Sequence, residues 1–420
     1  MTELREAVIV DAVRTPFGRA HKEKGFLRNV RSDDMGVMVL QEVVKRTGIE
    51  AKEVDEVILG AVEQLGEQAH PGRNCLVLAG FPYEVPGLSV ERACVTAMSS
   101  VHVAALAVMA GMGDIYIAGG LDSMTHIALP VVTPDTDFDE LLKQENTMLS
   151  AMNPNPKMYG TMNPLDLVGG ITAEKLVDMF HFTREEMDHW AVMSNLRAVE
   201  AQKAGKLKDE IMPVAAQDQQ GAEFMLDYDQ GPRADTTYEK VAKLPTPFKP
   251  GDGTISAASA SGTADGAAVC MVMSKEMARK KGLKPFATVR AMAVAGCDPT
   301  IMGWSVVPAT RKALAMMKMK LDRMELIEIN EAFACVPLVF IKEFGMDPEK
   351  ARAIINVNGG ACAIGHPVGA TGARLIGHLA YEMNRRGNRW GLATICGGYG
   401  QGGTTILERE DYDWGEYRKV

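Results

Sequence analysis

Two stretches of this sequence repeat one pattern, and this repeat limits the possible folds more than any other feature. Residues 44–60 (VKRTGIEAKEVDEVILG) align without gaps with residues 314–330 (LAMMKMKLDRMELIEIN). Each stretch reads as the end of an amphipathic helix, a polar turn and a buried strand. An α/β unit that recurs in both halves of a chain predicts a duplicated fold, in which each half carries a mixed sheet with helices.

Two further pairs of segments extend the repeat. Residues 113–120 (GDIYIAGG) and 389–398 (RWGLATICGG) both read as a short apolar strand that ends in Gly-Gly. The two halves also begin alike, with EAVIVDAVRTP and FATVRAMAVAG. We therefore expect an α/β protein of two similar mixed-sheet halves with layered helices. The expected N-terminal half comprises residues 1–120 and 251–275, and the expected C-terminal half comprises residues 276–420.

The region between the halves, residues 121–250, has a different character. It is rich in Pro, Met, Asp and Asn, and it contains one strong helix pattern, TREEMDHWAVMSNLRAVEAQKAG. Thr183 is a suitable N-cap because Glu186 follows three residues later, as in a capping box, and Gly205 ends the pattern. We expect this region to be an inserted loop domain that covers a site rather than a unit that builds sheet.

Charge and cysteine content exclude several classes of protein. The formal net charge of −9 over 420 residues argues against nucleic acid as a main partner, although local basic residues could hold a small acidic ligand. Seven cysteines without CxxC pairs fit neither a disulfide framework nor a metal site, and they suggest free thiols in a reducing compartment. Without a signal-like start or an apolar run of membrane length, we expect a cytoplasmic protein with no membrane span.

Cys94 is the first candidate for chemistry. The segment LSVERACVTAMSSVHVAALAVMAG places it between a strand and a helix that is small-residue and apolar nearly all round. A thiol at a helix N-terminus feels the positive end of the helix dipole, which favours the thiolate. The alternative is a buried, inert cysteine, which is the commonest state of a free thiol.

A second cysteine and a histidine lie in glycine-rich segments. Cys396 belongs to WGLATICGGYGQGGTTILE, which reads as a strand, a glycine-rich turn and a returning strand. His366 belongs to NGGACAIGHPVGATG, where five glycines surround one imidazole. Glycine lets the main chain approach a ligand closely, so we expect a site at these segments, against the alternative of ordinary loops. We expect the other cysteines to be structural: Cys75, Cys270, Cys297, Cys335 and Cys362.

Taken together, these segments resemble the thiolase family. The shared motifs are ERACVTAMSS, GTISAASASGTADGAA, NEAF, NGGACAIGHPVGATGAR and CGGYGQG, and they occur in the family's order and spacing over nearly the whole chain. The resemblance implies the duplicated thiolase fold, with a loop domain inserted in the first half. It also implies that the protein makes or cleaves a carbon–carbon bond between acyl thioesters of coenzyme A.

The resemblance further implies a role for each motif residue. Cys94 matches the nucleophile that carries the acyl group, His366 matches the base for its thiol, and Cys396 matches the acid/base for the α-carbon proton. Two oxyanion sites are implied. One is formed by His366 and a water held by Asn330, and the other by the backbone N–H groups of Cys94 and Gly398. Coenzyme A is then a substrate, and no tightly bound cofactor is expected.

Binding and assembly follow from the same resemblance. Arg233 aligns with an arginine near the adenine end of coenzyme A, and Ser261 aligns with a serine that contacts pantetheine. We expect Glu331 to be structural, held by backbone hydrogen bonds. The family also implies a homodimer or homotetramer that can associate with other β-oxidation enzymes.

The chain departs from the family pattern in several places. The nucleophile loop reads CVTAMSS instead of CASG, and Ser259 and Ala264 stand where asparagine is usual. Val168 and Gly169 take the first two places of a His-Met-Gly found in short-chain members, so we expect room for acyl chains longer than acetoacetyl. Residues 135–145 are acidic where some tetramers carry a basic loop, which favours a dimer.

Three other classes of protein share parts of this pattern. A fatty-acid-type ketosynthase would carry a second histidine in place of NEAF. A thioesterase would need a positioned water and no second cysteine, and a non-catalytic scaffold subunit would be expected to lack one of Cys94, His366 or Cys396. Cleavage and condensation use the same residues in opposite order, so the sequence leaves the direction of the reaction open, together with the acyl chain length.

Overall fold

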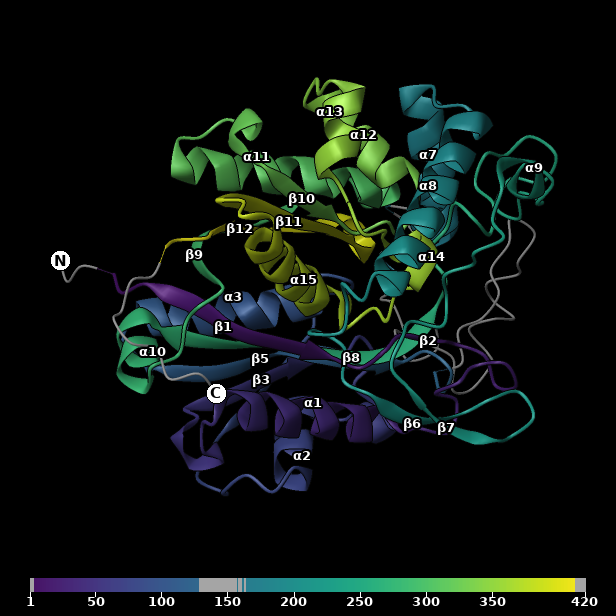
Figure 1. Cartoon of the computed structure of the whole chain (residues 1–420). Coiled ribbons are helices and arrows are strands. Elements are labelled where there is room, and N and C mark those ends of the chain that lie inside the picture. Colours follow the sequence, from purple (N-terminus) through teal and green to yellow (C-terminus); the bar gives the residue numbers. More distant parts are fainter. Residues whose placement is uncertain (1–3, 128–156, 158–160, 162–163, 412–420) are drawn as a thin grey trace.

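The computed structural model describes residues 4–127, 157, 161 and 164–411 (Figure 1). A ten-stranded mixed sheet runs through the molecule in the order β10-β11-β12-β9-β1-β8-β5-β3-β4, with the short β2 paired to β8. The strands are β1 Ala7–Arg14, β2 Gly18–Arg19, β3 Glu56–Gly60, β4 Gly87–Val90, β5 Ile115–Ser123, β8 Ala264–Ser274, β9 Ala287–Gly296, β10 Leu326–Ile329, β11 Trp390–Gly397 and β12 Gln401–Glu408.

The sheet has the internal symmetry that the repeat predicts. Strands β3, β5, β8 and β1 lie on one side of the β1/β9 junction, and β10, β11, β12 and β9 mirror them on the other. The β3–β5 and β10–β11 pairs are parallel, and the next pair on each side is antiparallel. Only two residue pairs join β1 to β9, so the strands of the two halves are joined along a short stretch of the sheet.

The gapless repeat is confirmed element by element. Helix α1 (Ser32–Thr47), a 3₁₀ turn (Ala51–Glu53) and β3 recur as α11 (Val306–Met317), a 3₁₀ turn (Leu321–Arg323) and β10. Within the aligned residues every boundary falls at the equivalent position, except that β3 is one residue longer than β10, and both helices begin before the alignment does. The hydrophobic pattern therefore located these elements correctly.

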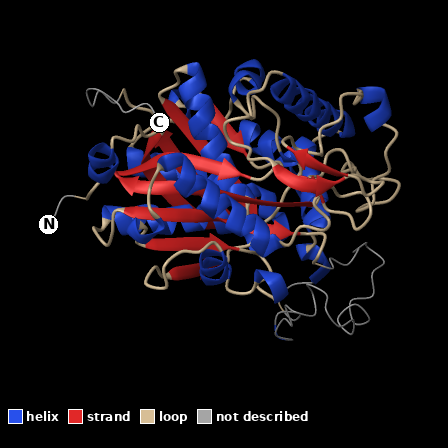
Figure 2. Ribbon diagram, turned by 60° about the horizontal axis from the view of Figure 1, so that its bottom comes forward, coloured by secondary structure: helices blue, strands red, loops and turns tan. Residues whose placement is uncertain are grey.

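Helices cover the sheet on its outer faces and fill the space between its two halves. Helices α3 and α15 lie between the β1/β5/β8 side and the β11/β12 side and contact both, while α1 and α11 lie outside (Figure 1). Figure 2 shows the strands from a second direction, with helices on both faces. The helices are α1, α2 Pro71–Leu78, α3 Thr96–Met109, α7 Gly169–Phe180, α8 Arg184–Lys203, α9 Tyr238–Val241, α10 Lys275–Lys281, α11, α12 Cys335–Glu343, α13 Pro348–Ile354, α14 Ala361–Ile364 and α15 Thr371–Arg386.

The expectation that β5 ends in Gly-Gly is wrong. The strand continues to Ser123, and both glycines lie inside it. A Cβ on Gly119 would collide with the carbonyl oxygen of Ala268, and one on Gly120 would collide with that of Gly369. These glycines therefore permit close packing of backbones inside the fold and do not mark the end of a strand.

The inserted region is partly as predicted. Thr183 and Glu186 form the capping box of α8, with Glu186 N donating to Thr183 Oγ1 at 3.2 Å, and Gly205 follows the helix with φ +68°. The region also contains a small hairpin, β6 (Val214–Gln217) and β7 (Glu223–Leu226), which does not join the main sheet. No helix among the described residues is long and apolar enough to cross a bilayer.

Candidate active site

Two of the predicted motifs lie at the ends of neighbouring parallel strands. Ile329 at the end of β10 pairs with Thr394 of β11, and Asn330 N donates to the carbonyl oxygen of Thr394 at 3.0 Å. Cys396 lies two residues further along β11. The carboxyl ends of parallel strands are where α/β folds place ligand sites, so the local geometry brings Asn330 and Cys396 to one edge.

The segment that carries Ser261 joins the NEAF motif to the histidine loop. Ser261 N donates to the carbonyl oxygen of Ala332 at 3.0 Å, and Ala334 N donates to that of Ser259 at 2.7 Å. On the other side, His366 N donates to the carbonyl oxygen of Gly262 at 2.8 Å. Three motifs that are far apart in the sequence are thus held side by side by main-chain hydrogen bonds.

The imidazole of His366 lies in a directed chain of hydrogen bonds. Its Nδ1 is 2.6 Å from Thr371 Oγ1, and that hydroxyl donates to the carbonyl oxygen of Pro367 at 2.8 Å. Because the hydroxyl proton is already used, Nδ1 must carry the proton of the neutral ring. Nε2 then presents its lone pair, 3.3 Å from Asn330 Nδ2.

Burial also keeps this imidazole neutral. It lowers the pKa of His366 to about 4, so the ring is an uncharged proton acceptor near neutral pH. The Oδ1 atom of Asn330 is buried and has no hydrogen-bond partner among the described residues. An orphaned buried acceptor beside a basic nitrogen fits a site that holds a water or a substrate group. Thr371 was missed at the sequence level, although its place in the same glycine-rich motif was a usable signal.

Cys94 lies in the loop between β4 and α3, two residues before the helix begins. The preceding residue, Ala93, has φ +44°, a conformation that is costly for a residue with a side chain and that clusters at functional sites. The backbone N–H groups of Gly398 and of Cys94 itself lower the pKa of the Cys94 thiol. The residues of the predicted oxyanion site are therefore close to this thiol, and a Cβ on Gly398 would lie 3.6 Å from Ala93 Cβ.

The helix dipole does not make Cys94 a thiolate in the free protein. Burial raises the pKa of Cys94 to about 11, and the two N–H groups only oppose that rise. The desolvation of a charged sulfur outweighs the dipole of a helix that begins two residues away. The resting thiol is protonated at neutral pH, so it needs a base before it can react.

Cys396 is fully buried, and its loop fits closely against the loop of Cys94. Burial raises the pKa of the Cys396 thiol well above its usual value, and the neighbouring Cys94 adds to the rise. A Cβ on Gly397 would lie 3.0 Å from Val95 Cγ2 and 3.5 Å from Cys94 N. The glycine therefore allows the two cysteine loops to approach.

A glycine also brings the histidine loop to the helix of Cys94. Gly372 lies at the start of α15, and a Cβ there would collide with the backbone nitrogen of Met98 in the first turn of α3. Gly369 N donates to the Asp122 carboxylate at the end of β5. These contacts bring the loops of Cys94, His366, Asn330 and Cys396 together, and they explain why glycines surround His366.

Glu331 is structural, but the expected backbone hydrogen bonds are not its main partners. Its buried carboxylate accepts hydrogen bonds from Trp190 Nε1 at 2.9 Å and Ser194 Oγ at 2.7 Å, both on α8. Asn356 Nδ2 donates at 2.9 Å, and one backbone donor, Cys362 N, lies at 3.1 Å. Side chains of the inserted helix, which local sequence could not reveal, therefore anchor the NEAF motif.

The two predicted binding residues lie at the periphery of this cluster. Arg233 is exposed, and the adjoining Gly231 packs directly on the carbonyl oxygen of Ala363 in α14, which precedes His366. Ser261 is half-buried. Two histidines outside the motifs are core residues: His102 contacts Thr405 at 2.8 Å, and His378 contacts Glu210 at 2.6 Å. The acidic residues 135–145 lie outside the described residues.

Comparisons with known proteins agree over nearly the whole chain. Residues 7–276 match the model of the thiolase N-terminal domain, and residues 283–409 match that of the thiolase C-terminal domain. The chain is 38% identical over 407 residues to a 3-ketoacyl-CoA thiolase of Saccharophagus degradans, covering 96% of this chain and 98% of the relative. It is 39% identical over 404 residues to an acetyl-CoA acetyltransferase of Syntrophomonas wolfei, covering 96% and 99%.

Solved structures show the same similarity. The acetyl-CoA acetyltransferase of Bacillus anthracis superposes with a TM-score of 0.85 at 36% identity, covering 98% of this chain and 100% of the other. Human mitochondrial 3-ketoacyl-CoA thiolase superposes with a TM-score of 0.84 at 30% identity, covering 97% and 99%.

Proposed function

This chain belongs to the thiolase family, and we propose how its residues carry out acyl-CoA C-acyltransferase activity. The reaction is thiolysis of a 3-ketoacyl-CoA by coenzyme A to acetyl-CoA and a shortened acyl-CoA, or the reverse condensation. The observation that carries the proposal is the His366–Asn330–Thr371 chain of hydrogen bonds, in a cluster that the loops of Cys94 and Cys396 also enter. This chain of hydrogen bonds presents a neutral base, His366 Nε2, beside an amide donor, Asn330 Nδ2.

Thiolysis begins at Cys94. His366 Nε2 takes the thiol proton, and the sulfur attacks the 3-keto carbon of the substrate. The N–H groups of Cys94 and Gly398 stabilise the oxyanion that forms. The bond between C2 and C3 then breaks, and its electron pair passes to C2 as an enolate of acetyl-CoA. The acyl fragment stays on Cys94 as a thioester.

Cys396 completes the first half of the reaction. Its thiol donates a proton to C2, which releases acetyl-CoA, while the protonated His366 and Asn330 stabilise the enolate oxygen. A raised thiol pKa suits this role, because Cys396 keeps its proton until a carbanion forms. In the second half, coenzyme A gives its thiol proton to Cys396 and attacks the Cys94 thioester. Cys94 leaves as a thiolate and recovers its proton from His366.

A spectrophotometric assay tests this function. Loss of acetoacetyl-CoA should depend on added free coenzyme A and should yield acetyl-CoA. Loss that proceeds equally without coenzyme A would indicate a thioesterase and would overturn the proposal.

We propose two halves, one of residues 1–120 with 251–275 and the other of residues 276–420. We propose that the inserted region between them, residues 121–250, covers the acyl side of the site. Gly169, the first residue of α7, faces the NEAF motif: a Cβ there would lie 3.4 Å from Phe333 Cζ and 3.4 Å from Met302 Cε. A longer side chain at this position would fill the adjoining space. A glycine here therefore leaves room for a longer acyl chain.

We predict that Gly169→Met lowers activity on six- to ten-carbon 3-ketoacyl-CoA substrates and spares acetoacetyl-CoA. Each methylene excluded from the pocket loses ~0.8 kcal/mol of burial, so excluding two lowers kcat/KM roughly tenfold. The measurement is kcat/KM along a ladder of chain lengths. Gly169→Ala is the matched control, because one methyl group makes only ordinary contacts. An equal loss at every chain length would show that the residue does not set chain length.

We propose that Arg233 and Ser261 bind coenzyme A. We also propose a homodimer in the cytoplasm, where free thiols persist. Strand β4 is an outer strand of the sheet, and apolar side chains on and beside it are exposed. Leu88 on β4, Leu78 on α2 and Leu106 on α3 are 38%, 57% and 56% exposed. A second copy of the chain would cover this edge and its apolar surface.

We predict that light scattering at micromolar concentration gives the mass of a dimer, and that Leu106→Glu shifts it toward the monomer. A charge placed in an apolar interface is desolvated without a partner. Met316→Glu is the control, because Met316 is 61% exposed on α11, away from β4. A stable tetramer, or a dimer that Leu106→Glu leaves intact, would contradict this assembly.

A further inference from the structure

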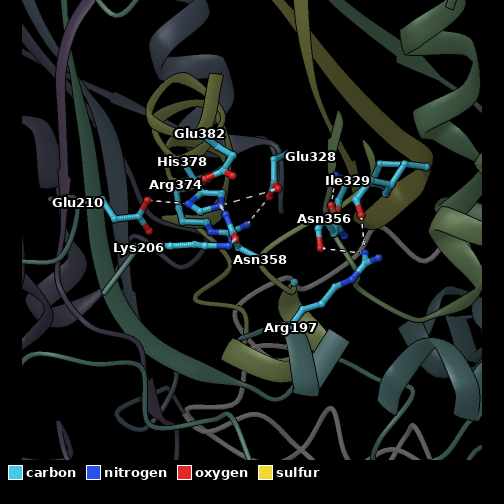
Figure 3. A network of polar contacts seen from close by, with 12 residues as sticks. Arg197, Lys206, Glu210, Glu328, Ile329, Asn356, Asn358, Arg374, His378 and Glu382 are labelled. Carbon is cyan, nitrogen blue, oxygen red and sulfur yellow. Dashed lines mark hydrogen bonds and ion pairs between the residues drawn. The ribbon is translucent and has the colours of Figure 1, made fainter. Parts of the chain in front are cut away.

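Asn356 occupies an unusual place in the network of polar contacts beside β10 (Figure 3). It is buried, and its φ of +46° is a left-handed conformation that most residues with a side chain avoid. Asparagine tolerates this conformation better than most residues, because its short amide can bond to nearby backbone. The hydrogen bonds of Asn356 show what an asparagine contributes in this conformation.

The side chain of Asn356 acts as a substitute for a neighbouring strand. Its Oδ1 accepts a hydrogen bond from Ile329 N at 2.8 Å, and its Nδ2 donates to the carbonyl oxygen of Ile329 at 2.8 Å. Its backbone N donates to the carbonyl oxygen of Ile327 at 3.0 Å. Strand β10 is the outer strand of the sheet and pairs with β11 on its other edge. Asn356 therefore satisfies the backbone groups on the open edge.

The amide of Asn356 is itself held in place. Nδ2 also donates to Glu331 Oε1 at 2.9 Å, on the far side of Asn330. Arg197 of α8 donates to the carbonyl oxygens of Ile355 at 2.9 Å and of Asn356 at 3.3 Å (Figure 3). Asn356 thus contacts the residue before Asn330 and the residue after it, from a backbone that the half-buried Arg197 restrains.

Asn330 is the residue between these two contacts. The backbone N–H of Asn330 donates to the carbonyl oxygen of Thr394 on β11. This hydrogen bond holds Asn330 only from the β11 side of β10. Its amide must lie 3.3 Å from His366 Nε2 and expose Oδ1 to the site. Small displacements of such a group weaken transition-state stabilisation strongly.

We infer that Asn356 is a positioning residue that fixes Asn330 for its part in carbon–carbon bond chemistry. This inference rests on the proposed function, in which Asn330 and His366 stabilise the enolate oxygen. The N–H groups of Cys94 and Gly398 stabilise the other oxyanion, which forms during transfer of an acyl group to and from Cys94. Loss of Asn356 should therefore impair one half of the chemistry and spare the other.

Asn356→Gly tests this separation, because glycine keeps the positive φ and removes only the amide. We expect kcat for thiolysis to fall at least about tenfold, less than the 10²–10³ that complete loss of an oxyanion donor costs. Exchange of acetyl groups between acetyl-CoA and labelled coenzyme A should stay within about threefold of the wild-type rate. Asn356→Asp, which keeps the acceptor for Ile329 N but loses the donor, should show the same selective loss.

Asn358→Ala is the matched control. Asn358 is an equally buried amide in the same segment, but its amide contacts Lys206 and His378 and not β10. The Asn358→Ala substitution should lower the melting temperature of the protein without changing the ratio of the thiolysis rate to the exchange rate. Amide hydrogen exchange gives a second readout: the Ile329 N–H should exchange faster in Asn356→Gly than in the control.

The inference is overturned if thiolysis and exchange fall equally in a folded Asn356 variant, or if thiolysis in Asn356→Gly stays at the wild-type level. Wild-type protein that catalyses exchange but not thiolysis, or neither reaction, would instead overturn the proposed function, and the positioning role with it. The wild-type measurements therefore come first and separate the two failures.

Discussion

Cys94→Ala is expected to abolish both thiolysis of 3-ketoacyl-CoA and exchange of acetyl groups between acetyl-CoA and coenzyme A. In the proposed mechanism both reactions pass through a thioester on this sulfur. Removal of a covalent nucleophile should lower both rates by roughly 10⁴ or more. The two rates are measured with acetoacetyl-CoA and with labelled coenzyme A.

Cys75→Ala is the control for this variant. Cys75 is a buried cysteine that contacts α1 and belongs to none of the motifs, so its removal should cost stability and leave both rates unchanged. Acetyl exchange that persists in Cys94→Ala would show that another residue carries the acyl group.

Cys396→Ala is expected to separate the two reactions. Without an acid/base for the α-carbon proton, thiolysis and condensation should fall by roughly 10³, within the range for loss of general acid–base catalysis. Acetyl exchange moves an acyl group between sulfurs and needs no proton at carbon, so it should stay within about tenfold of wild type. Loss of exchange to the same degree as thiolysis would place Cys396 in acyl transfer as well.

Local sequence predicted the elements that local physics controls. The repeated helix–turn–strand pattern was located correctly, because amphipathic periodicity and buried apolar runs are properties of neighbouring residues. The capping box at Thr183 was correct for the same reason. The motif residues Cys94, His366, Asn330 and Cys396 are brought together by the fold, as the family resemblance implied, and their catalytic roles remain proposals.

The parts that sequence did not reveal depend on contacts between distant segments. The high pKa of the Cys94 thiol arises from burial in the folded protein, which a helix dipole inferred from local sequence does not reveal. Glu331 takes two of its donors from α8, far away in the chain. Gly119 and Gly120 look like the end of a strand, but they lie within β5 because other backbones pack against them.

The central claim is that Cys94 alone carries the acyl group, and mass spectrometry of a trapped intermediate tests it most directly. Wild-type protein is mixed with acetyl-CoA, quenched in acid and digested, and the acetylated peptide is sequenced. The acetyl group should be found on Cys94 in the wild type and in Cys396→Ala, and it should be missing from Cys94→Ala. An acetyl group on Cys396 would contradict the assignment of both cysteines.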